Sequence, residues 1–312
     1  MTRCSFLGLF IILSCSPLSA QGIRITDVKG DIGCRDPVFS PDGTKIAFSS
    51  NKIGYTNIWV MDVNGKRQKQ ITKKLRNSSA PAWSPDGKKI AFQSYGIGPK
   101  DAKKNIWLFD IFVVNIDGTD LRQLTNAQSL GERAQHPCWS PDGKQMVFTR
   151  DARLWVMDSD GKNQFPFTPL PANKWERCCD WSPKEDTLAY IAVEEVRKPW
   201  KEYRRIWLIG LNRENQRRFS QETKVEDVQW SKNGQYFYYS THPSLWKIKA
   251  DGSEPPMKVL DWGPIFDSGR KFDISPDEQW AVLDDSGHDN EGNIYKYRLN
   301  SGITKESSSV EK

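Results

Sequence analysis

A ten-residue phrase occurs twice in the chain and recurs in looser form four more times. Residues 83–92 read WSPDGKKIAF, and residues 139–148 read WSPDGKQMVF. When substitutions are allowed, the phrase is found with its serine at positions 40, 84, 140, 182, 231 and 275. The steps between these serines are 44, 56, 42, 49 and 44 residues. A period of about 40–45 residues with four strands per unit is the signature of β-propeller blades.

Each copy of the phrase combines a tight turn with a strand. In Ser-Pro-Asp-Gly the proline presets φ for a turn, the aspartate can bond back to the backbone, and the glycine tolerates a left-handed conformation. A nearly continuous apolar run such as residues 89–93 follows, which is typical of strands covered on both faces. A third strand such as residues 57–62 leads to an Asn-Gly or Asp-Gly turn and an outer strand. Nearly all of the 13 tryptophans fall in these repeats, which indicates blade packing rather than a ligand platform.

The repeats predict an all-β fold, a six-bladed β-propeller with four antiparallel strands per blade, over residues 21–305. The expected blades lie near residues 36–72, 80–125, 136–168, 178–220, 227–260 and 271–305. Residues 306–312 are expected to be a disordered tail. We expect residues 23–26 to join the last blade, because this would tie the two ends together and remove an exposed edge. The alternative is that residues 302–306 supply the last outer strand.

The first twenty residues have the layout of a secretory signal peptide. A short basic start precedes the apolar run 6–13, and small residues lead to a cleavage site after Ala20. This run is shorter than the roughly 20 residues that a membrane-spanning helix needs. A second interpretation is a lipoprotein box at residues 12–15, with Cys15 acylated. We therefore expect a periplasmic or secreted protein, with membrane association only if Cys15 carries a lipid.

Composition and motifs argue against several classes of function. The 45 Lys and Arg exceed the 39 Asp and Glu too little to indicate a nucleic-acid partner. The chain has no Gly-x-Ser-x-Gly elbow, no Gly-rich phosphate loop and no His-Glu-x-x-His, so we expect a non-catalytic protein without a cofactor. After signal cleavage four cysteines remain, and we expect at most one disulfide, from Cys138 to Cys178 or Cys179, with the pairing left open.

The stretch 81–92, together with the closing Arg-Gln-Leu-Thr at 122–125, resembles the WD40-like repeat of the TolB propeller family. The resemblance covers roughly residues 23–305 and is most specific in the first three units. It implies a protein-interaction platform in the periplasm, acting in the Tol-Pal envelope system with an outer-membrane lipoprotein as partner. The same repeat also forms oligogalacturonate lyases, so a metal-dependent polysaccharide lyase is an alternative function, and a glycan-binding module is another.

Function is expected on the face that carries the loops between the second and third strands and the connectors between blades. The period is stretched in two of these loops, at residues 95–104 and 194–204, and both are rich in basic residues. We predict a moderately basic, aromatic-studded surface on a monomer, which binds an acidic envelope protein, a lipoprotein or an anionic glycan. Solvated loops without a partner are the alternative. The predicted binding residues are Arg35, Gln135, His136, Arg177, Lys198, Trp200, Lys201 and Arg270.

The three histidines of the chain, His136, His242 and His288, fall on the same predicted face. If they converged at the mouth of the propeller, they would resemble the metal site of oligogalacturonate lyases and could hold a divalent metal in the central channel. The alternative, which we favour, is that the last two lie in ordinary polar hairpins and no metal is bound.

Overall fold

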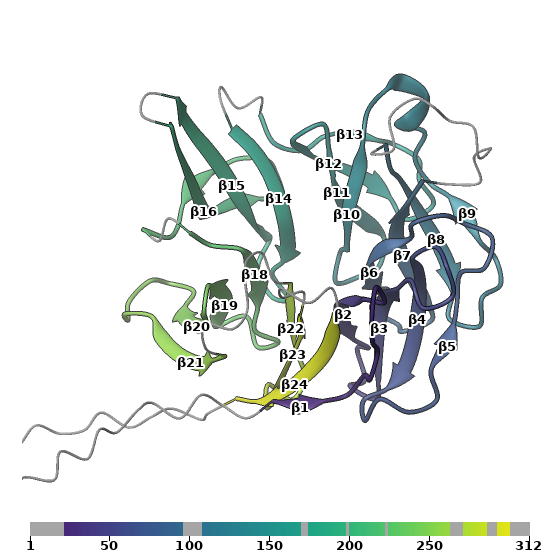
Figure 1. Cartoon of the computed structure of the whole chain (residues 1–312). Coiled ribbons are helices and arrows are strands. Elements are labelled where there is room, and N and C mark those ends of the chain that lie inside the picture. The colour runs from purple at the N-terminus through teal and green to yellow at the C-terminus, as the bar shows by residue number, and fades with distance from the viewer. Residues whose placement is uncertain are drawn as a thin grey trace, which may run out of the picture.

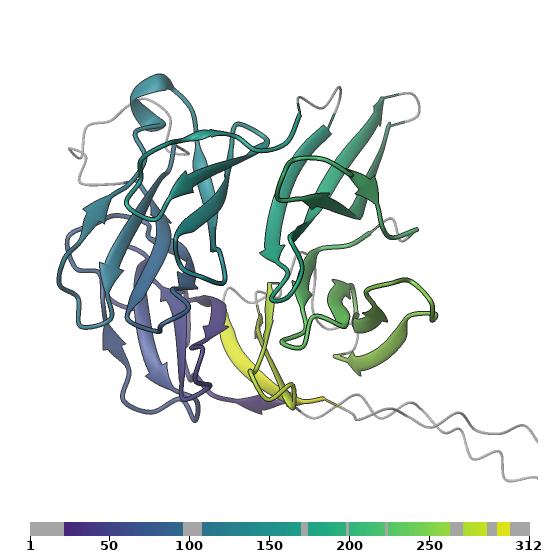
Figure 2. The ribbon, with the colours of Figure 1, turned by 180° about the vertical axis from the view of Figure 1, so that it is seen from behind.

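The computed structural model of the chain describes residues 22–95, 108–169, 174–197, 200–221, 224–262, 271–285 and 292–299. These residues form six four-stranded antiparallel sheets around a common centre (Figure 1 and Figure 2). Beside the strands they include a short 3-10 helix, η1 (Gln128–Leu130). The predicted all-β six-bladed propeller is therefore confirmed. The predicted signal peptide 1–20, Cys15 and the tail 306–312 lie outside the described residues.

The four strands of each blade are arranged from the centre of the ring outward. Blades 1 and 2 consist of β2 (Cys34–Phe39), β3 (Lys45–Ser50), β4 (Asn57–Asp62), β5 (Lys69–Gln70), and β6 (Ser79–Trp83), β7 (Lys89–Ser94), β8 (Asp110–Asn115), β9 (Arg122–Gln123). Blades 3 and 4 consist of β10 (Ala134–Trp139), β11 (Gln145–Arg150), β12 (Arg153–Asp158), β13 (Phe165–Pro166), and β14 (Lys174–Trp181), β15 (Thr187–Arg197), β16 (Trp200–Gly210), β17 (Arg217–Arg218). Blades 5 and 6 consist of β18 (Asp227–Trp230), β19 (Tyr236–Thr241), β20 (Ser244–Lys249), β21 (Met257–Asp261), and β22 (Phe272–Ile274), β23 (Trp280–Asp285), β24 (Asn293–Arg298), β1 (Ile23–Arg24).

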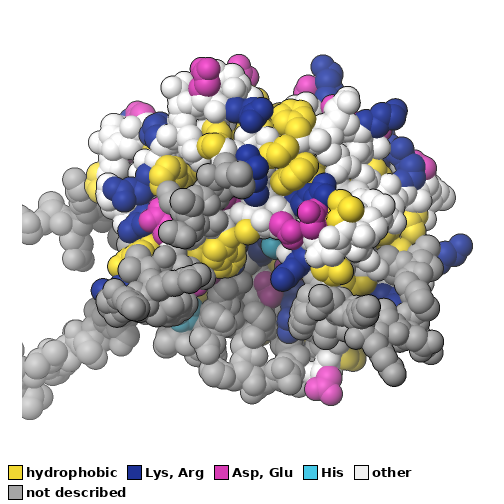
Figure 3. Space-filling view, turned by 90° about the horizontal axis from the view of Figure 1, so that it is seen from above, with side chains coloured by type: hydrophobic (Ala, Val, Ile, Leu, Met, Phe, Trp, Pro, Cys, Tyr) yellow, Lys and Arg dark blue, Asp and Glu magenta, His cyan; other side chains and the backbone are white. Residues whose placement is uncertain are grey.

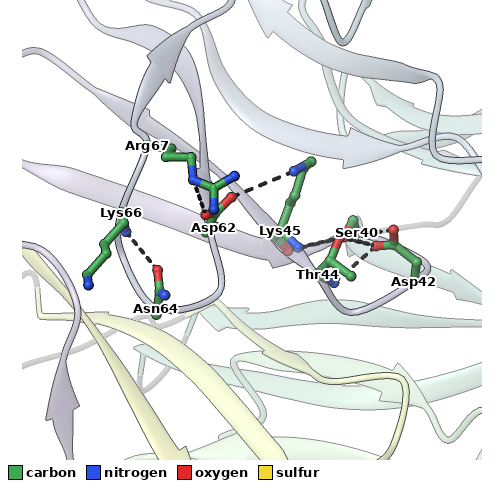
Figure 4. A network of polar contacts seen from close by, with 8 residues as sticks. All are labelled: Ser40, Asp42, Thr44, Lys45, Asp62, Asn64, Lys66 and Arg67. Carbon is green, nitrogen blue, oxygen red and sulfur yellow. Dashed lines mark hydrogen bonds and ion pairs between the residues drawn. The ribbon is translucent and has the colours of Figure 1, made fainter.

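The Ser-Pro-Asp-Gly turn joins the first two strands of a blade through a closed set of hydrogen bonds (Figure 4). In blade 1 the Ser40 hydroxyl donates to Asp42 Oδ1 at 2.5 Å and accepts the N–H of Lys45 at 2.9 Å. Asp42 Oδ1 also accepts the N–H of Thr44 at 3.0 Å, and Gly43 has a left-handed φ of 70°. The hydroxyl and the N–H hold the pKa of Asp42 below its usual value. The same bonds recur in blades 2 and 3, so the repeated phrase encodes a turn geometry.

The apolar core lies between successive blades. Ala47 and Val60 of blade 1, for example, share one buried cluster with Phe92 and Val114 of blade 2. Corresponding clusters are found at the other blade junctions. Because each sheet is covered on both sides, its central strands are nearly continuous apolar runs. Nothing helical in the described part of the chain has the length and apolar character of a membrane-spanning segment.

The tryptophan of the repeated phrase bonds across three of the blade junctions. Its indole N–H donates to a backbone carbonyl on the inner strand of the preceding blade. The residue that carries this carbonyl lies two positions before the motif serine of its own blade. We call the residues at this position the waist residues: Val38, Ala82, Cys138, Asp180, Gln229 and Asp273. The bonded pairs are Trp83 with Val38, Trp139 with Ala82 and Trp181 with Cys138, at 3.2, 3.2 and 3.3 Å.

The other three junctions use the side chain of a polar waist residue instead. Each accepts a backbone N–H from the inner strand of the next blade. The pairs are Asp180 with Trp230, Gln229 with Ile274 and Asp273 with Phe39, at 2.7, 3.0 and 2.6 Å. The last of these pairs connects blade 6 to blade 1, so every inner-strand junction of the ring has a hydrogen bond of one of the two kinds.

We predict that Trp139→Phe lowers the free energy of unfolding by about 1 kcal/mol more than Trp230→Phe, because only the first change removes a hydrogen bond. Trp230 is a matched control: it occupies the same repeat position and is buried, and its Nε1 has no partner among the described residues. Both variants lose the same volume, so urea unfolding followed by circular dichroism isolates the bond. Equal losses for the two variants would contradict this role of the tryptophan.

The N-terminal strand completes the last blade, as predicted. Ile23 pairs with Lys296 and Arg24 with Tyr295, both on β24 (Figure 1, purple beside yellow). Beyond the strand, the Asn293 side-chain oxygen accepts the N–H of Val28 at 3.0 Å. The two ends of the described chain are thus joined in one sheet, and residues 302–306 lie outside the described residues.

Candidate functional site

In the part of the chain that the structure describes, the second and third strands of blade 4 are longer than those of the other blades and extend it on the loop-rich face. Strands β15 and β16 have 11 residues each and pair up to Arg197 opposite Trp200, whereas β3 and β4 have 6 residues each. The extra length adds about 17 Å at roughly 3.4 Å per residue. Figure 1 shows the paired ends of β15 and β16 at the same end of the molecule as η1, which precedes β10. Among the described residues, the β15–β16 hairpin therefore makes the loop-rich face uneven.

The base of the hairpin carries paired charges. Arg205 Nη1 lies 3.1 Å from Glu194 Oε2, and its guanidinium is 4.7 Å from the ring centre of Tyr203. Lys201 is exposed. Of the other predicted hairpin residues, Lys198 and the side chain of Trp200 lie outside the described residues, although the backbone of Trp200 belongs to β16.

The mouth of the propeller beside blade 4 holds a second set of paired charges. Arg177 Nη2 lies 3.3 Å from Glu226 Oε2, and Arg204 Nη1 pairs with the same carboxylate oxygen. Arg204 also lies 3.1 Å from Glu202, and Arg177 is 5.5 Å from the ring centre of Trp175. Because each described arginine here faces a glutamate, the charge is close to balanced at this point of the predicted basic surface.

The remaining predicted mouth residues occupy equivalent positions in other blades. Arg35 is exposed and Gln135 half-buried, each as the second residue of its inner strand. The carbonyl of Arg35 accepts the Ser49 hydroxyl at 3.1 Å. Arg270 lies outside the described residues. The structure thus places Arg35, Gln135 and Arg177 around one opening, with only Arg177 in a described ion pair.

Below the mouth, the inner strands of blades 1–4 contain a bulge. Their register with the second strand shifts at this point, and the residue in the bulge has a left-handed φ of 48–53°. This position lies four residues before the motif serine, and we call its occupants in the six blades the rim residues. They are Asp36, Ala80, His136, Cys178, Asp227 and Lys271.

A channel of about 490 Å³ runs along the axis, lined by the inner strands of all six blades. All six waist residues line it, and so do the rim residues of blades 3–6. On the side of blades 1–3 the waist is Val38, Ala82 and Cys138; on the side of blades 4–6 it is Asp180, Gln229 and Asp273. The channel therefore has one apolar wall and one polar wall.

Burial shifts the titration of the polar wall. It raises the pKa of Asp180 to about 7 and that of Asp273 to about 6. Burial, the largest single effect, lowers the pKa of Lys271, but the surrounding acidic groups, Asp227 first and Cys178 and Asp36 after it, together outweigh burial, so the Lys271 pKa lies above its usual value. Near neutral pH the channel thus contains an ammonium group and a partly protonated carboxyl group.

The two described histidines do not converge. His136 lines the channel, where burial lowers its pKa to about 3 and its Nδ1 has no partner among the described residues. His242 is exposed on the β19–β20 turn and does not line the channel, and His288 lies outside the described residues. Within the described ranges, no three His, Cys, Asp or Glu residues are grouped so that they could hold a metal ion.

The charged channel residues Asp180, Asp227, Lys271 and Asp273 were not predicted from the sequence. The signal that could have found them is the repeat itself. At the waist position Asp180 and Asp273 of units 4 and 6 replace the Val, Ala and Cys of units 1–3, and Asp227 and Lys271 of units 5 and 6 share the rim position; aligning the units would have brought each set together on the axis.

A closed ring of six blades around a lined channel defines the molecule as a six-bladed β-propeller. The family described as "TolB beta propeller domain" matches residues 18–101. "Tol-Pal system protein TolB" of Campylobacter jejuni (strain RM1221) is 27% identical over 145 residues, which is 45% of this chain and 32% of the relative. That of Rhizorhabdus wittichii is 38% identical over 69 residues, 20% of this chain and 15% of the relative. The matched part is about a third or less of the length of these curated relatives.

Solved structures share the fold at low identity. An oligogalacturonate lyase in complex with manganese superposes with a TM-score of 0.59 at 13% identity, over 91% of this chain and 95% of the lyase. TolB from Acinetobacter baumannii superposes with a TM-score of 0.55 at 15% identity, over 86% of this chain and 63% of TolB. At these low sequence identities, the comparison shows only that the fold is shared. The sequence matches make the chain similar to TolB propellers, and the solved structures share its six-bladed fold.

Proposed function

We propose that this propeller is a non-catalytic platform that binds an envelope protein or lipoprotein through its loop-rich face. The observation that carries the proposal is the β15–β16 hairpin, which projects beside the mouth and offers a wall against which a partner can pack. The relatives named for the Tol-Pal system support an envelope location, and the signal-like N-terminus supports export.

Exposed apolar side chains on the same face support a protein partner. Ile53 and Tyr55, in the β3–β4 loop, are 58% and 49% exposed, and Leu130 of η1 is 66% exposed. The Arg76 guanidinium lies 5.2 Å from the centre of the Tyr55 ring. Protein interfaces combine apolar and aromatic anchors with arginine in this way. Figure 3, which views this end of the molecule, shows hydrophobic, basic and acidic side chains interleaved.

The ion pairs at the mouth favour a protein over an anionic glycan. A polyanion would have to displace Glu226 from Arg177 and Arg204 before it could use either arginine. A protein surface with both charges and apolar groups could bind without breaking these pairs. We therefore place the glycan second among the partners.

The double variant Ile53→Asp/Leu130→Asp should reduce recovery of the bound envelope partner at least about tenfold, because each anchor at an interface contributes on the order of 1–2 kcal/mol. The assay is a pull-down with the mature chain from an envelope extract of the source cells, measured by quantitative mass spectrometry. Lys144→Glu is the control, since Lys144 is exposed on a Ser-Pro-Asp-Gly turn of the opposite face. A partner set unchanged by the double variant, or lost with Lys144→Glu alone, would count against the loop-rich face.

A further inference from the structure

Three of the four described cysteines lie together in the channel wall. Cys138 belongs to β10, and Cys178 and Cys179 belong to the neighbouring inner strand β14. All three are half-buried free thiols in this structure, whereas Cys34 is buried at the start of β2. The sequence left open which of the two adjacent cysteines faces Cys138.

The bulge in β14 sends the adjacent cysteines to different neighbours. The register shifts between Arg177 and Cys179, and Cys178 has a φ of 48°. Cys178 Sγ lies 3.8 Å from the carbonyl oxygen of Glu226, toward blade 5. Cys179 instead packs with Cys138 on the apolar cluster between blades 3 and 4. The bulge thus separates the two thiols and leaves Cys179 opposite Cys138.

Cys138 and Cys179 lie on neighbouring inner strands and pack against the same cluster, and the Cys179 thiol raises the pKa of Cys138. The strands are held in place there by the Trp181 indole, which donates to the Cys138 carbonyl at 3.3 Å. Both thiols line the 490 Å³ channel, which a small solute can enter. No third ligand completes a metal site with them among the described residues. Two thiols that pack against one cluster from adjacent strands are suited to disulfide formation, which needs an approach of the sulfur atoms to bonding distance.

We propose that Cys138 and Cys179 form a redox-dependent cross-link that ties blade 3 to blade 4 beside the channel. The oxidant is a small organic disulfide, RSSR. One protein thiolate attacks a sulfur of RSSR and releases RS⁻, and the second protein thiolate then attacks the mixed disulfide and releases the other RS⁻. Two protein thiols are oxidised to one S–S bond, RSSR is reduced to two thiols, and the two protons pass to the released thiolates.

The reaction is expected to be faster at alkaline pH. The neighbouring Cys179 thiol is the largest cause, and burial the second, that raise the pKa of the Cys138 thiol well above its usual value. Little thiolate is therefore present at neutral pH, and the thiolate is the attacking species.

The test treats the purified full chain with oxidised glutathione at about pH 8.5, then alkylates free thiols and digests with trypsin. Cys138 is released in residues 134–144, and Cys178 and Cys179 are released together in residues 178–184. We expect a linked pair of these peptides, sensitive to dithiothreitol, and a rise in melting temperature of several degrees that dithiothreitol reverses.

Two single variants assign the bond. Cys178→Ser should keep the linked peptides and Cys179→Ser should lose them. Circular dichroism of the reduced variants confirms that both fold. The proposal is overturned if the wild-type chain yields no linked peptides, or if the link survives Cys179→Ser and disappears with Cys178→Ser.

Discussion

Gly65→Ala should lower the free energy of unfolding by about 3 kcal/mol, whereas Gly252→Ala should lower it by about 1 kcal/mol. Both glycines follow an Asn or Asp in the second turn of a blade and have a left-handed φ, of 83° and 71°. A Cβ at Gly65 would lie 3.0 Å from the carbonyl carbon of Ile25 and closer still to its oxygen. A Cβ at Gly252 meets nothing within 4 Å. The difference is the steric cost alone, because the backbone cost is common to both.

The clash at Gly65 concerns the closure of the ring. Ile25 directly follows β1, the strand that completes blade 6, so an alanine must push this segment away from blade 1. Urea unfolding of the two variants measures the difference in free energy. Limited proteolysis should also cut the N-terminal segment faster in Gly65→Ala than in Gly252→Ala. Equal stability of the two variants would mean that residues 23–26 do not lie against the Asn64-Gly65 turn.

The propeller should be most stable at mildly acidic pH, near pH 4–5, rather than at neutral pH. The Asp180 pKa is raised to about 7 in the folded chain, above its unfolded value near 3.8. Between these values the folded chain binds one proton more than the unfolded chain. Stability therefore rises as the pH falls from 7 to 4, by up to about 1.4 kcal/mol per pH unit. Asp273, with a folded pKa of about 6, acts in the same direction below pH 6.

Two other sets of groups act in the opposite direction. His136 has a folded pKa of about 3, so between pH 6.5 and 3 the folded chain binds one proton fewer at this site than the unfolded chain. This lowers stability as the pH falls and offsets the gain from one of the two aspartates. The turn aspartates have folded pKa values below 3.8, as Asp42 and Asp142 show, so their stabilisation is lost in more acidic solution. The balance of these terms sets the maximum near pH 4–5.

Melting temperatures from pH 3 to 8 test this balance. In Asp180→Asn the rise in stability between pH 7 and pH 5 should disappear, because the side chain no longer titrates. The hydrogen bond is kept, since the amide oxygen can still accept the backbone N–H of Trp230. Asp142→Asn is the control and should change only the acid limb. A wild-type curve that falls steadily from pH 7 to pH 5 would refute the assignment.

The repeated turn and the ring were predictable because their causes are local. Ser40, Asp42 and Gly43 form their bonds within six residues, and the spacing of the copies fixes the number of blades. Unit 6 shows the limit of this reasoning, because Glu278 replaces the glycine. It adopts a φ of 54° and its carboxylate accepts the Tyr238 hydroxyl at 2.9 Å, a contact between blades that the local sequence does not reveal.

The charge of the mouth could not be derived by counting cations. Arg177 and Glu226 are 49 residues apart in the chain and meet only because blades 4 and 5 are adjacent. The acids and the lysine of the channel escaped notice for a similar reason, since each looks like a single polar residue within an inner strand. Such pairs become visible only when the six repeats are superposed in a ring.

The most direct test of the binding account is site-specific photo-crosslinking in the intact envelope of the source cells. A photoreactive residue is placed at the exposed Lys201, near the tip of the projecting hairpin, or at Lys144, on the opposite face. The account predicts a discrete cross-linked envelope protein from position 201 and none from position 144. No adduct from position 201, or the same adduct from both positions, would contradict the claim that the loop-rich face of this propeller binds the partner.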